Sequence, residues 1–118
     1  MASGILPIPT DMPIKYLGTF GNANSQRAAT ITLPRGKFYI LFVASAVATK
    51  NLVAFITSTS TGVTNYDVIH QDNDSVLTIS TDTDTVKITT PNNQNVMSVL
   101  VIPMGVHSEI PTMSASSS

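Results

Sequence analysis

The sequence of 118 residues contains no cysteine and no tryptophan, and only 11% of its residues are charged. Without cysteine, neither a disulfide nor a thiolate metal site can form. An average soluble domain is about one quarter charged, whereas here Thr, Ser and Asn fill most polar positions. Such a surface hydrogen-bonds without the charge repulsion that keeps monomers apart. The composition therefore favours self-association over a monomer with a plain polar surface.

Basic clusters and long apolar runs are missing as well. The formal net charge is -1 and the Lys and Arg residues are scattered along the chain, which argues against the basic stripe that nucleic-acid binding requires. No apolar run approaches the roughly 18 residues of a membrane span, and the proline-interrupted amino end has no basic region typical of a signal peptide. We expect no nucleic-acid partner and no membrane insertion.

What the sequence does contain is a succession of β-branched and aromatic runs separated by Gly, Pro, Asn and Asp clusters. This pattern is typical of a β-sandwich or barrel. No apolar spacing of the helical kind competes with it, and Glu occurs once, at Glu109. The sequence predicts an all-β, antiparallel, jelly-roll-like sandwich of about eight strands. The expected strands are 15–20, 27–33, 37–48, 52–57, 63–70, 75–80, 85–90 and 95–102.

Three segments differ in character. Residues 1–14 form an extended apolar arm interrupted by prolines, residues 15–104 form the sandwich domain, and residues 105–118 form a Ser-rich tail that we expect to be flexible. Because the arm is apolar, we expect another protein surface to shield it from water. It either docks on a neighbouring subunit or a larger particle, or packs on its own domain.

Two predicted strands are apolar on both faces, at residues 38–43 and 99–102. The outward face of an antiparallel sandwich strand normally meets water, so these strands indicate a second buried surface. That surface is either a subunit interface or a face covered by the arm or a long loop. The predicted oligomer or particle contacts are Ile5, Leu6, Ile8, Tyr39, Leu41, Val43, Val99 and Val101.

The sequence contains few residues that could act in catalysis. Only His70 and His107 could serve as the general base that a nucleophile needs. His107 follows the last expected strand. Asp67 precedes His70 by three residues, and such residues point to opposite faces of a regular strand, so Asp67 is not expected to orient His70. We therefore expect no enzyme activity and rank a small hydrolase last.

Acidic residues cluster on either side of the expected strand 75–80, with Asp72 and Asp74 before it and Asp82 and Asp84 after it. The strand separates the two clusters by roughly 20 Å, too far for a glycosidase carboxylate pair. The first cluster lacks the later Glu of an EF-hand, and its turn position already explains Asp and Asn. We expect no cofactor and no metal, and calcium at Asp72 and Asp74 stays an open alternative.

Carbohydrate binding stays open as a second function. Sugar rings stack on aromatic faces, and the amphipathic aromatics here are Tyr16, Tyr39 and Tyr66. Ordinary strand packing explains tyrosines equally well. A lectin-like module would hold a host surface glycan in loops at one end of the sandwich, and substitution of Tyr66 or the Asp72 loop would abolish binding.

The run Thr30-Ile31-Thr32-Leu33-Pro34-Arg35-Gly36-Lys37-Phe38-Tyr39-Ile40-Leu41, the segment 75–80 and the closing strand 96–102 resemble small β-sandwich domains of bacteriophage virions. The likeness covers about residues 17–104. It implies a jelly-roll-like, trimeric, non-enzymatic virion protein that acts as a tail-fibre tip, a host-attachment head or a capsid decoration among other virion proteins. The residues before the domain contain no collagen-like or coiled-coil shaft, which favours a small separate protein attached through its arm.

Overall fold

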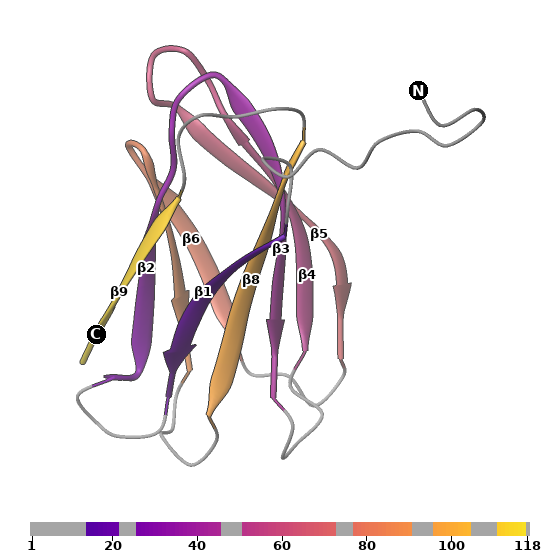
Figure 1. Cartoon of the computed structure of the whole chain (residues 1–118), viewed down its shortest axis with the longest axis vertical. Helices are drawn as coiled ribbons and strands as arrows, with labels where there is room; N and C mark the ends of the chain where they lie inside the picture. The colour runs from indigo at the N-terminus through magenta and orange to yellow at the C-terminus, as the bar shows by residue number, and fades with distance from the viewer. Residues whose placement is uncertain are drawn as a thin grey trace, which may run out of the picture.

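The computed structural model describes residues 14–21, 26–45, 51–72, 77–90, 96–104 and 111–117. These residues form two packed layers of strands (Figure 1). The strands are β1 (Lys15–Phe20), β2 (Ala28–Thr32), β3 (Lys37–Ala44), β4 (Leu52–Ser58), β5 (Thr64–Gln71), β6 (Thr78–Asp82), β7 (Thr85–Thr89), β8 (Met97–Met104) and β9 (Thr112–Ser116).

One layer is a five-stranded sheet in the order β1-β8-β3-β4-β5, and the other is a four-stranded sheet in the order β6-β7-β2-β9. Every pairing within the sheets is antiparallel. Across the layers, β9 lies against β1 and β6 lies against β5. The predicted all-β antiparallel sandwich is therefore confirmed.

The core lies between the sheets and follows from strand alternation. In β3 and β8, every second side chain points inward and is buried, while its neighbours point outward. Fully burying one such aliphatic side chain contributes about 1.5–3 kcal/mol. The largest fully buried side chains are Tyr39, Phe20, Ile31, Leu41, Leu52, Ile56, Ile88, Met97, Val43, Val86, Val99 and Val101.

Strand β9 corrects the expectation of a flexible tail over residues 105–118. Thr112–Ser116 pair along their whole length with β2, where Met113 lies opposite Ile31. Met113 packs against the core, and its Cε atom would lie 3.3 Å from a Cβ built on Gly18. The sequence of this segment is short and Ser-rich, so its strand character comes from the free edge of β2 and not from its own propensity.

The expected strand boundaries differ from the observed ones by a few residues. β8 continues to Met104 through Pro103, and β6 continues to Asp82. β3 ends at Ala44, and residues 46–50, which the prediction included in part, lie outside the described residues. Residues 1–13 of the predicted arm lie outside them too.

Within the described ranges the secondary structure contains strands and turns and no α-helix. Among these residues there is no helix long and apolar enough to span a bilayer.

Candidate functional site

The outer face of the five-stranded sheet is apolar across β1, β8, β3 and β4. Residues directly opposite in an antiparallel pair share a face, so the register defines rows of neighbouring side chains. The central row runs from Tyr16 through Leu100 and Phe42 to Val53. We call the whole set the apolar face. It comprises Tyr16, Phe38, Ile40, Phe42, Val53, Phe55, Leu100, Ile102 and Met104.

Several side chains of the apolar face are exposed to solvent. Tyr16, Phe38 and Met104 are 62%, 51% and 45% exposed. The rings of Phe38 and Phe55 stack with their centroids 6.1 Å apart. In a two-layer antiparallel sandwich this side of a sheet normally carries polar residues and meets water. A contiguous apolar patch in that position is a candidate surface for contact with another molecule.

The predicted contact residues on β3 and β8 lie on the other side of the sheet. Tyr39, Leu41, Val43, Val99 and Val101 are at most 1% exposed and belong to the core. The Tyr39 hydroxyl donates to the Pro34 carbonyl at 3.1 Å, so its polar atom has an internal partner. The strands are doubly apolar as the sequence indicated, and the prediction chose the inward set.

The sequence did contain one signal for the outward set on β8. Ser98 shares the outward alternation with Leu100 and Ile102, and its polar side chain marks that face. On β3 the corresponding signal pointed the wrong way, because Lys37 at the strand start shares the inward alternation with Tyr39. The other three predicted contacts, Ile5, Leu6 and Ile8, lie outside the described residues.

His70 has an acidic partner, and it is a different one from the residue considered in the sequence. Its Nε2 atom lies 3.0 Å from Asp72 Oδ1, and the His70 side chain is 59% exposed. Asp67 and His70 also share the outer face, since they lie opposite Phe55 and Val53 across an irregularity in the register. The expectation of opposite faces was wrong because this bulge adds one residue to β5.

The Asp72 carboxylate joins two segments at one end of the sandwich through its contacts with His70 and Asn51, which we call the His70–Asp72 clip. Its Oδ2 accepts the Asn51 backbone N–H at 3.1 Å, which joins the end of β5 to the residue before β4. The hydrogen bond from His70, followed by the one from Asn51, holds the pKa of Asp72 below its ordinary value. Of the proposed calcium ligands, Asp74 lies outside the described residues.

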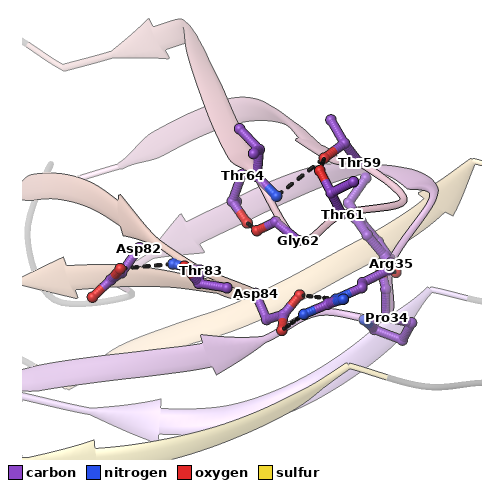
Figure 2. A network of polar contacts seen from close by, with 11 residues as sticks. Pro34, Arg35, Thr59, Thr61, Gly62, Thr64, Asp82, Thr83 and Asp84 are labelled. Atoms are coloured by element: carbon purple, nitrogen blue, oxygen red, sulfur yellow. Dashed lines mark hydrogen bonds and ion pairs between the residues drawn. The ribbon is translucent and has the colours of Figure 1, made fainter.

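At the opposite end of the strands, three turns meet around one ion pair (Figure 2). Arg35 donates from Nε to Asp84 Oδ1 at 2.8 Å and from Nη2 to Asp84 Oδ2 at 2.9 Å. The Asp84 backbone N–H donates to the Gly62 carbonyl at 2.9 Å, and its carbonyl accepts the Leu33 N–H at 2.8 Å. This three-turn clamp therefore ties the β2–β3, β4–β5 and β6–β7 turns together across both sheets.

Gly62 is required by this geometry. Its φ is +91°, and a Cβ there would lie 2.9 Å from both Arg35 Nη2 and Asp84 Oδ1. Asp84 itself has φ of 62° at the β6–β7 turn, a conformation that Asp tolerates better than most residues. The hydrogen bond and charge of Arg35 lower the pKa of Asp84, and Asp84 raises the pKa of Arg35.

Neither polar end presents an assembled reaction centre within the described residues. Next to the clamp, Thr59 Oγ1 accepts the Val63 N–H at 3.0 Å and Thr64 Oγ1 donates to the Gly62 carbonyl at 3.3 Å (Figure 2). These hydroxyls bond their own turn. The described part of the chain contains no cluster of three or more His, Asp or Glu suited to a metal and encloses no pocket. The candidate site is therefore a surface, the apolar face.

Comparison with known proteins gives one structural likeness. No protein-family model matches the chain, and no curated protein matches its sequence. In fold, the chain is similar to part of a tailspike protein, gp49 of the Acinetobacter baumannii bacteriophage Fri1, described as a capsular polysaccharide depolymerase. The match has a TM-score of 0.60 at 14% sequence identity and covers 86% of this chain but 19% of the tailspike. The chain thus shares its fold with a portion of a phage tail protein.

Proposed function

We propose that this chain is a non-enzymatic structural component of a bacteriophage virion that self-associates, as a trimer, through the apolar face and acts at the tail in host attachment. The observation that carries the proposal is the apolar face itself. It covers four of the five strands of one sheet, and in a soluble protein a patch of this kind is covered by another protein surface.

The other observations support the same function. The fold is similar to part of a phage tailspike, and a tail component works as a permanent assembly, to which low surface charge is suited. The clamp and the His70–Asp72 clip use their polar atoms to join turns. A scaffold that presents surfaces needs such ties and needs no catalytic group.

Carbohydrate binding remains the second candidate because one tyrosine is free to stack on a sugar. Tyr66 on β5 is 44% exposed at the edge of the sheet, and its chain neighbours Asn65 and Asp67 are exposed on the other side of the strand. The tailspike with the similar fold is described as acting on capsular polysaccharide. Saturable binding to a capsular glycan array that Tyr66→Ala abolishes and Tyr16→Ala preserves would establish this function.

The self-association is tested with matched substitutions on the two sheets. Phe42 lies on the apolar face of β3, and Thr30 lies on the outer face of β2, each on an interior strand of its sheet. Phe42→Lys should dissociate the oligomer in multi-angle light scattering, because it places a charge in the contact, whereas Thr30→Lys should leave the mass unchanged. Phe42→Thr keeps strand propensity and should weaken the oligomer with the fold intact by circular dichroism.

A monomeric wild-type protein at micromolar concentration would contradict the self-association. The assignment to the tail is tested separately with antibodies against the purified chain. They should label tailed particles at the tail in electron micrographs, and labelling of the head alone would move the protein to a decoration role.

A further inference from the structure

The edge of the five-stranded sheet formed by β5 carries several exposed apolar side chains. β5 is the last strand in the order β1-β8-β3-β4-β5, and seven of its eight residues are exposed. Within β5 the exposed large hydrophobic residues are Tyr66, Val68 and Ile69, and Val63 immediately precedes the strand. Tyr66 and Val68 lie on the inner side of the sheet, opposite the buried residues Ile56 and Ala54. On the outer side, the residues of β5 in register with β4 are the polar Asn65, Asp67 and His70. The edge therefore offers apolar contacts on its inner side and polar contacts on its outer side.

The backbone of this edge is available for pairing. No strand of the described residues pairs with the outer side of β5, so alternate residues turn their N–H and C=O groups to that side. Natural edges are normally protected by Lys, Pro or short length. β6 and β9 have five residues each, and β1 carries Lys15, whereas β5 has eight residues without Lys, Arg or Pro. Its protective features are the single carboxylate Asp67 and the bulge between Val68 and His70.

The arm has the sequence expected of a strand that would cover such an edge. Residues 5–10 read Ile-Leu-Pro-Ile-Pro-Thr. The prolines at positions 7, 9 and 13 are all odd-numbered, so in an extended strand their missing N–H groups would all lie on one side. If that side faces away from β5, Leu6, Ile8 and Thr10 keep their backbone groups for pairing. The prolines then prevent a further strand from adding.

The distance decides which copy supplies the arm. Ile14 directly precedes β1, which is at the opposite edge of the sheet from β5. The four strand spacings between them amount to about 19 Å. From Thr10 to Ile14 the chain spans at most about 14 Å. A pairing that includes Thr10 therefore cannot reach β5 of its own copy.

We infer that β5 is the docking site for residues 5–10 of a second copy of this chain, which add to the five-stranded sheet as an edge strand. This inference rests on the proposed self-association and names the segment that links the copies. Because the arm and the edge are different surfaces, the contact is head-to-tail, and a head-to-tail contact can close into a ring. The exchanged arm acts in addition to the apolar face.

The first test exploits the absence of cysteine from the chain. Full-length Ile8→Cys protein is mixed with Asp67→Cys protein carrying a mass tag, and a short bis-maleimide is added. The expected product is a cross-link between the two copies. Thr78→Cys on the exposed edge strand β6 is the control and should give none. Equal yields with Asp67→Cys and Thr78→Cys would overturn the inference, as would a cross-link formed only within single chains of a dilute Ile8→Cys/Asp67→Cys double variant.

The second test uses proline position. Ile8→Pro and Ile5→Pro each remove one isoleucine, but only Ile8→Pro removes an N–H on the side that would face β5. Leaving a hydrogen-bonding group of β5 without its partner should weaken assembly roughly tenfold, and Ile5→Pro should change it much less. Equal effects of the two prolines would overturn the pairing.

A third test, deletion of the arm, separates this inference from the proposed function. Removal of residues 1–10 should release the amide protection of β5 in hydrogen exchange while leaving that of β3 unchanged. If the shortened chain keeps both its oligomeric mass and its β5 protection, the arm exchange is wrong and the apolar face alone holds the copies together. If Phe42→Lys leaves the mass unchanged while the Ile8 to Asp67 cross-link forms, the arm exchange stands and the role of the apolar face is wrong.

Discussion

On the outer face of the five-stranded sheet, Phe42 lies between Leu100 and Val53, whereas on the outer face of the four-stranded sheet, Thr30 lies between Lys87 and Ser114. The strand geometry is the same in both sheets, but the outward side chains are apolar in the first and polar in the second. The outward residues of the four-stranded sheet are Ala28, Thr30, Thr32, Thr78, Ser80, Asp82, Thr85, Lys87, Thr89, Thr112, Ser114 and Ser116.

The difference shows what each face is adapted to. Hydroxyl side chains keep their hydrogen bonds to water, so the four-stranded sheet is stable when it faces solvent. The apolar face gains free energy only when another surface removes it from water, at about 25 cal/mol per Å² of apolar area. The fold itself needs one buried face per sheet, so folding alone does not account for the second apolar face, which the proposed self-association would bury.

The largest expected effect separates the two sides of one strand. Leu41→Ala should lower the free energy of unfolding by about 2–5 kcal/mol, because it leaves a cavity in the core. Phe42→Ala on the outer side should cost the dilute monomer about 1 kcal/mol, because no closed cavity forms. Urea denaturation of both variants measures the difference. Equal losses in the monomer would mean that the outer face is already covered by the chain itself.

A smaller loss is expected at the clamp that joins the sheets and so supports both faces. Gly62→Ala should cost about 1–3 kcal/mol, because it combines a positive φ with two polar contacts at 2.9 Å. Gly36→Ala is the matched control, with φ of +73° and no atom within 4 Å of the added Cβ, and should cost about 1 kcal/mol. Thermal unfolding of both variants compares them, and equal shifts would mean that the clamp accommodates the methyl group.

Substitution on the polar face should change stability still less. Thr30→Val keeps the shape and the strand propensity of the side chain, so the free energy of unfolding should change by no more than about 0.5 kcal/mol. Its oligomeric mass should also stay that of the wild type. A gain in mass would show that the four-stranded sheet is close to self-association as well, and the contrast between the faces would then be one of degree.

The smallest effect concerns acid. Arg35 lowers the pKa of Asp84, so the ion pair stabilises the fold above the ordinary carboxyl pKa of about 3.9 and this contribution is lost as the pH falls through the lower folded value. Wild-type protein should therefore lose thermal stability more steeply below about pH 4 than Asp84→Asn. Asp67→Asn removes an exposed carboxylate outside the clamp and should follow the wild-type slope. Parallel slopes for all three proteins would exclude a contribution from the ion pair.

Strands and turns that depend on short segments of the chain could be predicted from the sequence. Alternation in 85–90 and the turn residues around Pro34 and Gly36 predicted strands that the structure contains. The doubly apolar character of β3 and β8 was also visible. Which of their two faces is buried could not be predicted, because both sets of side chains are apolar. Alternation separates the two sets but does not indicate which one faces the core.

Features that depend on a partner strand were missed. β9 is a strand because β2 has a free edge and Met113 has a place in the core. The shared facing of Asp67 and His70 depends on the bulge that the pairing of β5 with β4 contains. The clamp joins Arg35 to Asp84 across 49 positions of sequence, and no local pattern connects residues so far apart.

The sequence by itself thus determined an all-β protein with low charge, turns at defined places and more apolar strand surface than one core requires. These properties follow from side-chain chemistry and the two-residue period of a strand. The tertiary structure alone decided that Leu41 is in the core and Phe42 on the apolar face, and that β5 is a free edge. The reason is that facing and edge position arise from the pairing of strands distant in sequence, which also fixes the surfaces available for assembly.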